Sequence, residues 1–159
     1  MSLALGLQAS AVSSALRPFG PVESARATRH HVLVDPKDLR EALGAARREL
    51  KLDHFVQLAT IDVGDAFELR YILTGSHRAL VSVRTRLPRA APHVASVHDL
   101  LPPAGLYERQ VHDLFGVVFD GHPGLSRLVL AEDWPEGVHP LRKDFLVEPA
   151  TRPGAKGGA

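Results

Sequence analysis

The stretch YERQVHDLFGVVFDGHP, residues 107–123, holds an unusual density of side chains that can do chemistry. A Glu–Arg pair, two histidines and two aspartates suit a metal site, a proton-transfer site or a charged surface that binds another protein. Glu108 and His112 lie four residues apart, the spacing of two ligands on one helix face, and His122 follows. A site for general acid–base catalysis could be assembled from Glu108, His112, Asp113 and His122.

Other features argue against a metal centre or an enzyme built on this stretch alone. There is no HExxH pattern, and the chain contains no cysteine, which excludes disulfides, thiolate zinc sites, iron–sulfur ligation and cysteine nucleophiles. No glycine-rich phosphate loop precedes a helix. A simpler interpretation is two ion pairs on the helix surface, Glu108 with His112 and Arg109 with Asp113, each contributing roughly 0.3–0.5 kcal/mol.

A third interpretation is that this stretch docks on another protein together with the segment HPLRKDF, residues 139–145. There, apolar side chains alternate with paired charges close to the lone tryptophan, Trp134, and aromatic residues and arginine are enriched in interfaces. Planar guanidinium groups that can pair with carboxylates are supplied by Arg109, Arg127 and Arg142. Trp134 and Phe145 could equally cap the core of their own domain. Docking is the favoured interpretation, with the metal and enzyme alternatives left open.

The bulk composition fits one globular domain. The chain has 159 residues, 45% hydrophobic and 23% charged, with a formal net charge of +1. That charge gives no reason to expect nucleic-acid binding. No apolar run reaches the roughly 20 residues that cross a bilayer. The mildly apolar opening has its first positive charge only at Arg17, so it does not resemble a secretory signal, and we expect a cytoplasmic protein.

Hydrophobic periodicity predicts the elements that position this stretch. Residues 30–35, 55–61, 67–74 and 80–85 have strand character, and the second and third of these should form a hairpin around Gly64. A helix over residues 36–50 begins at the capping residue Asp35 and has one apolar face. It should cover the sheet. The fold class is therefore α+β, with a small mixed or antiparallel sheet packed by helices.

The second half of the chain is predicted to be less regular. Residues 87–97 should form an irregular connection or a poor helix, and residues 127–131 a short strand or extended segment. Between them, Tyr107, Val111, Leu114 and Phe115 have helical spacing up to Gly116. The expected organisation is a flexible segment over residues 1–28, one compact domain over residues 29–148 with a Pro/Gly-rich C-terminal extension, and a disordered tail over residues 149–159.

The ordered set YERQVHDLFGVVFDGHP, SRLVL and EDWPEGVHPLRKDF resembles the C subunit of NADH–quinone oxidoreductase, respiratory complex I. The same domain occurs in complex-I-like, membrane-bound nickel–iron hydrogenases of the formate hydrogenlyase type. The resemblance is densest over residues 104–145. It extends more loosely back to Val32, through HFVQLATIDV, FELRYIL and PHVASVHDLLP.

This resemblance implies a hydrophilic, non-catalytic subunit without a cofactor of its own. It would pack on a large subunit that houses the quinone pocket or the nickel–iron centre, beside an iron–sulfur small subunit, at the inner side of the cell membrane. No nucleic acid and no direct membrane insertion are implied. The residues that match the family motifs, and that the resemblance places at the subunit interface, are Glu108, Arg109, Asp113, His122, Arg127, Asp133, Trp134, Arg142, Lys143, Asp144 and Phe145.

Some positions depart from the family pattern. Gln110 stands where a second glutamate is common, Ser126 where an arginine is frequent, and Leu106 where a tryptophan is frequent. The linker WPEGVHPLRKDF is longer than the form typical of complex I and is closer to the hydrogenase branch. Both versions, a complex I subunit and a hydrogenase subunit, stay open, as does a free-standing enzyme that uses the cluster of Glu108, His112, Asp113 and His122.

Overall fold

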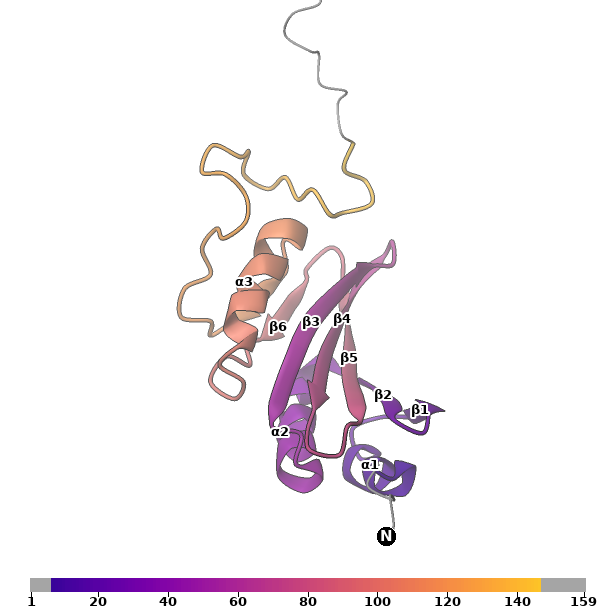
Figure 1. Ribbon diagram of the computed structural model, residues 1–159. Coiled ribbons are helices and arrows are strands. Elements are labelled where there is room, and N and C mark those ends of the chain that lie inside the picture. Colours follow the sequence, from indigo (N-terminus) through magenta and orange to yellow (C-terminus); the bar gives the residue numbers. More distant parts are fainter. Residues whose placement is uncertain (1–6, 147–159) are drawn as a thin grey trace, which may run out of the picture.

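A five-stranded mixed sheet forms the centre of the molecule (Figure 1), in a computed structural model that describes residues 7–146. The strand order is β1-β2-β5-β4-β3, and only the β2–β5 pair is parallel. The strands are β1 (Val22–Arg26), β2 (Arg29–Val34), β3 (His54–Asp62), β4 (Ala66–Thr74) and β5 (Leu80–Pro88). The predicted hairpin of residues 55–61 and 67–74 is confirmed, as are the predicted strand over residues 80–85 and the α+β fold class.

Three α-helices accompany the sheet: α1 (Ala9–Leu16), α2 (Leu39–Leu50) and α3 (Ala104–Phe115). The side chain of Asp35 caps the short 3-10 helix η1 (Pro36–Asp38), which leads into α2, as the sequence predicted. Helix α3 ends at Gly116, whose φ of 75° is left-handed and therefore suits glycine. No helix within residues 7–146 has the length and apolar character needed to cross a membrane.

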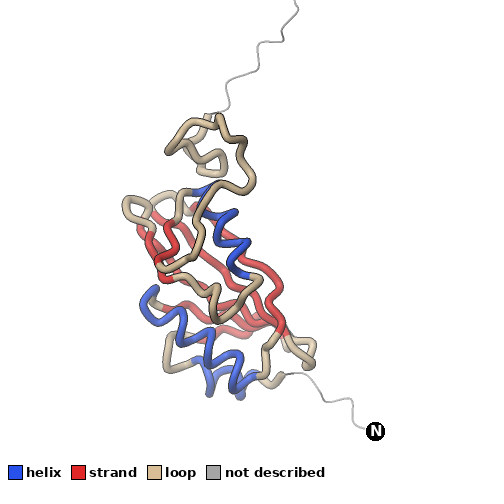
Figure 2. Tube along the Cα trace, turned by 90° about the vertical axis from the view of Figure 1, so that its left-hand side faces the viewer, coloured by secondary structure: helices blue, strands red, loops and turns tan. Residues whose placement is uncertain are grey.

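Side chains alternate in direction along the strands, so the sheet has a buried inner face and an outer face. On β4, the fully buried side chains of Phe67, Leu69, Tyr71 and Leu73 point inward. Helix α3 lies on this inner face, since Phe115 packs edge-on against Phe67 with ring centroids 6.0 Å apart. In the side view of Figure 2, α3 lies in front of the strands. The side chains between the inward ones form the outer face, which remains partly exposed.

A second, two-stranded parallel sheet pairs β6 (His93–Ala95) with β7 (Val118–Asp120). The sequence prediction missed both strands because each has only three residues, too few for a periodic pattern. Residues 87–97 are therefore not a poor helix. Residues 127–131 form no strand, because the amides of residues 128–130 bond to a side chain instead of to a neighbouring strand.

The hydrophobic core extends further toward the N-terminus than predicted. Helix α1 and strand β1 both fall within residues 1–28, the segment expected to be flexible, and Val12 and Leu16 of α1 are fully buried. The apolar residues of α1 pack mainly against α2. The domain therefore begins before residue 29. The predicted tail over residues 149–159 lies outside the described residues.

Candidate docking site around helix α3

Glu108 lies on the buried side of α3, where it makes a polar network inside the core. Its carboxylate accepts hydrogen bonds from Ser96 Oγ at 2.5 Å, from the Val97 N–H at 2.9 Å and from the Tyr71 hydroxyl at 3.3 Å. The side chain is fully buried, so it does not form the predicted surface pair with His112. Because three donors from β4 and the loop before α3 converge on it, Glu108 fixes the orientation of α3.

Asp113, near the C-terminal end of α3, holds the chain that follows β7. One carboxylate oxygen accepts the N–H groups of Leu128 at 3.1 Å and of Val129 and Leu130 at 2.8 Å. Desolvation raises the pKa of Asp113, but these hydrogen bonds outweigh it and hold the pKa below its usual value. The predicted pair of Asp113 with Arg109 does not form.

Arg109 contributes to the same loop from the neighbouring turn of α3. Its guanidinium donates to the backbone oxygens of Ser126 and Arg127, and to the Ser126 hydroxyl at 3.1 Å. Arg127 in turn donates to the carbonyls of Ala131, at 2.7 Å, and Glu132. Two arginines of the motif therefore shape the backbone of residues 126–132 and do not pair with carboxylates.

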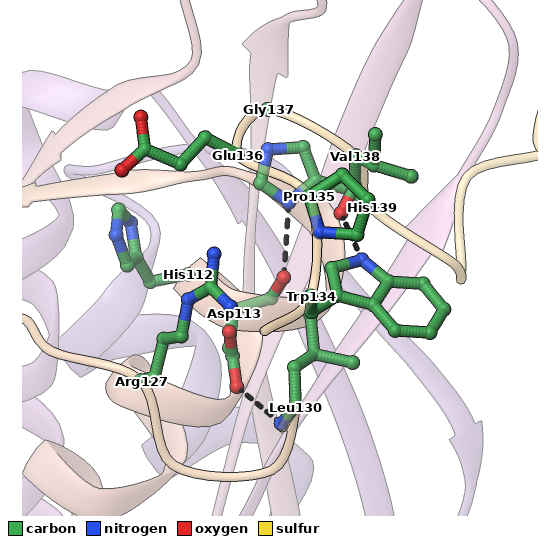
Figure 3. Close-up of a pocket in the computed structure, with 10 residues that line it drawn as sticks. All are labelled: His112, Asp113, Arg127, Leu130, Trp134, Pro135, Glu136, Gly137, Val138 and His139. Carbon is green, nitrogen blue, oxygen red and sulfur yellow. Dashed lines mark hydrogen bonds between the residues drawn. The ribbon is translucent and has the colours of Figure 1, made fainter. Parts of the chain in front are cut away.

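A cavity of about 200 Å³ opens between the end of α3 and the loop of residues 134–139 (Figure 3). In it, Trp134 Nε1 donates to the Val138 carbonyl at 2.8 Å. The Nδ1 atoms of His112 and His139 contact the carbonyls of Val117 and Asp113 at 2.8 and 2.9 Å. Both contacts require a proton on Nδ1. Desolvation lowers the pKa of His139, although the Asp113 carbonyl opposes this. A neutral imidazole with an Nε2 acceptor therefore suits His139.

The segment HPLRKDF returns to the inner face of the sheet through a second polar cluster. Arg142 Nε donates to the Phe115 carbonyl at 2.7 Å, and its guanidinium lies 5.3 Å from the Phe67 ring centroid. The Lys143 N–H donates to Asp62 at 2.9 Å. Arg89 bonds both to Asp62, at 2.5 Å, and to Asp144. The Lys143 backbone is thereby attached to Asp62 at the end of β3, and the side chains on either side of it bond to Phe115 and Arg89.

The remaining predicted interface residues lie along the same segment. His122 contacts the Gly105 carbonyl through Nε2 at 3.0 Å, and its ring lies beside that of His98. Phe145 packs on Trp134 with centroids 6.1 Å apart, so these two rings contact each other outside the buried core. Asp133 is exposed.

The four residues of the enzyme and metal alternatives do not converge. Glu108 points into the core, Asp113 toward residues 128–130, His112 toward Val117 and His122 toward Gly105. Across residues 7–146, no three histidine, aspartate or glutamate side chains are grouped so that they could hold a metal ion.

Apolar side chains exposed around this site give it a second property. Eight large hydrophobic residues of the described chain are exposed, and five of them belong to residues 106–146. We call these five the exposed apolar set: Leu106, Leu128, Val129, Leu141 and Leu146, with exposed fractions between 40% and 85%. These side chains are available for burial against another protein.

Sequence reasoning missed Asp62, Arg89, Ser96 and Tyr71, which complete the two polar clusters. A signal existed for Asp62, because the alternation of β3 places it on the same face as the buried Leu58. A signal also existed for Glu108, which precedes Val111 and Phe115 by three and seven residues on the buried helix face. Nothing in the sequence pairs Arg89 with Asp144, because 55 residues separate them.

The curated proteins to which this chain is similar are C subunits of oxidoreductases. The chain is 35% identical over 121 residues to the NADH-quinone oxidoreductase C subunit of Nocardia farcinica, covering 74% of this chain and 46% of the relative. It is 44% identical over 85 residues to that of Acidothermus cellulolyticus, covering 53% of this chain and 43% of the relative. It therefore spans less than half the length of these relatives. The F(420)H(2) dehydrogenase C subunit of Methanosarcina mazei is 32% identical, with 74% of this chain and 75% of that protein covered.

Solved structures share the fold. A chain of the membrane-bound sulfane sulfur reductase, described as an archaeal respiratory membrane complex, superposes with a TM-score of 0.74 at 28% identity, covering 84% of this chain and 82% of the other. A trypsin-resistant fragment of Nqo5 superposes with a TM-score of 0.59 at 24% identity, covering 69% of this chain and 91% of the fragment. The second likeness concerns the fold alone.

The match to a defined family covers most of the domain. Residues 32–151 match the family described as respiratory-chain NADH dehydrogenase, 30 Kd subunit. This range contains both polar clusters and the exposed apolar set. The relatives of this chain are C subunits of complex-I-like complexes, which agrees with the motifs of residues 104–145. The chain belongs to the family of the respiratory-chain NADH dehydrogenase 30 Kd subunit.

Proposed function

We propose that this chain is an accessory subunit of a complex-I-like, membrane-associated oxidoreductase and docks on the complex's large subunit. The observation that carries the proposal is the exposed apolar set on residues 106–146. The backbone under it is fixed by Glu108, Asp113 and Asp62. A surface with ordered, outward apolar side chains loses little conformational entropy on binding, which favours a stable interface.

The motif residues divide into two roles under this proposal. Glu108, Asp113 and Arg142 make their main contacts within the chain and position the surface. The exposed side chains of Leu128, Val129, Leu141, Lys143 and Asp133 contact the partner. The division revises the sequence-based expectation, in which Glu108, Arg109 and Asp113 presented their own charges to the large subunit.

The chemistry of the complex lies in other subunits. The large subunit carries the quinone site or the nickel–iron centre, and a small subunit carries iron–sulfur clusters. This chain supplies shape and contacts without a cofactor of its own, at the inner side of the cell membrane. The similar reductase structure is that of a respiratory membrane complex, and this likeness, with the names of the curated relatives, supports the setting.

A pair of matched variants tests the docking surface. Leu128→Asp places a charge within the exposed apolar set, and Val56→Asp places the same charge on a side chain of similar exposure on β3, 38% against 40%. Each is tagged and purified from its native host. We expect the Leu128 variant to lose its partner subunits, because a buried unpaired charge costs several kcal/mol, and the Val56 variant to keep them. Equal recovery of partners with both variants contradicts the docking surface.

Co-purification with elemental analysis distinguishes the two versions of the complex. Nickel and iron, together with a large subunit that contains two CxxC pairs, establish the hydrogenase version. Iron without nickel, with a flavin subunit or quinone reduction, establishes the complex I version. A tagged wild-type chain that is recovered alone, and that shows activity in isolation, refutes the proposed function and favours the free-standing enzyme.

A further inference from the structure

A second hollow lies at the C-terminal end of helix α2. Its volume is about 410 Å³, about twice that of the cavity beside Trp134. The residues that line it are Gly44, Arg47, Arg48, Lys51, Asp53 and Leu100. The hollow therefore lies between α2 and the loop that precedes α3, and it shares no lining residue with the candidate docking site.

The lining of this hollow is positively charged. Three side chains, those of Arg47, Arg48 and Lys51, are cationic and one, that of Asp53, is anionic, which gives a net charge of +2. Within residues 7–146, no ion pair joins any of the three cations to a carboxylate. Arg48 and Lys51 are exposed, so their charges are available to a ligand.

The dipole of α2 accounts for part of this clustering, because the C-terminal end of a helix favours positive side chains. It does not account for cations that surround a hollow. Arg47 is half-buried, and its Nη1 donates to the Leu100 carbonyl, which holds the guanidinium between α2 and the loop. Its Nη2 makes no hydrogen bond within the described chain and is not among the buried atoms, so it can still donate to a ligand.

Gly44 gives Arg48 its place in the lining. A Cβ at position 44 would lie 2.8 Å from Nη1 of Arg48, closer than such atoms normally approach. The Arg48 guanidinium therefore lies over the backbone of α2 at Gly44, where the side chain of an alanine would displace it. Glycine is otherwise unfavourable inside a helix, so its position beneath this arginine is a specific feature of the hollow.

We propose that this hollow binds a phosphate group. Guanidinium groups pair with phosphate oxygens through two parallel hydrogen bonds, and a lysine adds a compact positive charge. A phosphate carries a charge close to −2 at neutral pH, which matches the net charge of the lining, whereas a single carboxylate would leave it half-neutralised. The same chemistry recognises a free phosphate and the headgroup of an anionic lipid. The site goes beyond the proposed function and does not depend on it.

A titration of the full chain with inorganic phosphate, followed by nuclear magnetic resonance at constant ionic strength, tests the site. We expect saturable shifts of the amides of residues 44–53 and of Leu100. Arg48→Gln should weaken the affinity about tenfold or more, because a hydrogen bond between charged groups is lost. Arg78→Gln removes an exposed arginine from the turn between β4 and β5, and as the matched control it should leave the affinity unchanged.

Three results would overturn the proposal. Shifts that do not saturate would mean that phosphate only screens the surface charge. Equal weakening by Arg48→Gln and Arg78→Gln would mean that binding depends on total charge and not on the hollow. Saturable shifts confined to other residues would place the phosphate elsewhere on the chain.

Gly44→Ala gives an independent readout, since it keeps every charge of the hollow. The new Cβ should displace the Arg48 guanidinium and weaken phosphate binding severalfold. The midpoint of urea unfolding should not fall, because alanine favours a helix and the displaced group is the end of a flexible side chain. Undiminished affinity in this variant contradicts the role of Arg48 and overturns the site.

Sedimentation with phosphatidylglycerol vesicles identifies the source of the phosphate. If the vesicles sediment the wild-type chain but not the Arg48→Gln variant, and inorganic phosphate releases the chain, the ligand is a lipid headgroup. Saturable phosphate binding without sedimentation identifies a free phosphate. Equal sedimentation of the wild-type chain and the variant, with no saturable phosphate binding, overturns the site.

Discussion

Residues 7–120 and residues 121–146 are ordered by different forces. The first region buries a continuous apolar core between the inner sheet face and three helices. The second contains no helix or strand and no fully buried residue. Its backbone is held by side chains of the first region, chiefly Asp113, Arg109 and Asp62. This second region adds little to the core, to which the partly buried Leu125 and Leu130 contribute, and its exposed apolar side chains remain free for a partner.

The largest predicted effect is on the core region. Glu108→Ala leaves the Val97 N–H and the hydroxyls of Ser96 and Tyr71 without their acceptor and opens a cavity. We expect the free energy of unfolding to fall by about 3 kcal/mol or more, measured by urea denaturation followed by circular dichroism. Glu108→Gln keeps the volume and should cost roughly half as much. A loss below about 1 kcal/mol for Glu108→Ala would show that the network does not stabilise the domain.

The second prediction separates the two regions directly. Asp113→Ala removes the acceptor of three amides in the second region, where water can replace it because Leu128 and Val129 lie at the surface. We expect global stability to fall by only about 1 kcal/mol, while hydrogen exchange at residues 128–130 accelerates strongly. Asp133→Ala, at an exposed aspartate of the same segment, is the control and should change neither. Unaltered exchange in the Asp113 variant would mean that other contacts order the loop.

Acid should release the second region before it unfolds the first. Burial raises the pKa of Asp62, but hydrogen bonds from Lys143, Arg89 and Gly64 outweigh it and lower the pKa to about 2, from the usual 3.8. A lowered folded-state pKa means that the carboxylate stabilises the fold above pH 3.8, and that this contribution disappears as the pH falls toward 2. The pKa values of Asp113 and Asp144 are lowered as well.

Trp134 is the only tryptophan and lies in the second region, so its fluorescence reports on that region alone. On acidification we expect its emission to change at a higher pH than the circular dichroism of the sheet. In Asp62→Asn the fluorescence step in that pH window should be smaller, because only Asp113 and Asp144 of these three carboxylates then still titrate. Coincident transitions in the wild type would indicate one cooperative unit and contradict the division into two regions.

The same division explains what the sequence could and could not predict. The alternation of residues 67–73 and the helical spacing of residues 107–115 gave the correct strand and helix, because burial imposes a period. The three-residue strands β6 and β7 are too short to show one. The attachment of residues 142–144 to Asp62 is a long-range polar contact with no local pattern. For the candidate site, motif resemblance located the segment but misassigned Glu108 to the surface.

The smallest predicted effect has the opposite sign and concerns the core region alone. Lys51 follows α2 in a left-handed conformation, with φ of 53°, where a residue with a Cβ is strained and glycine is not. Lys51→Gly should therefore raise the free energy of unfolding by up to about 1 kcal/mol, although the extra freedom of glycine in the unfolded chain offsets part of this gain. Because no hydrogen bond or ion pair joins the Lys51 side chain to residues 121–146, the acid transition of Trp134 should stay at the wild-type pH. A parallel shift of both transitions would show that the stability of α2 reaches the second region, and that the two regions are coupled through more than Asp113, Arg109 and Asp62.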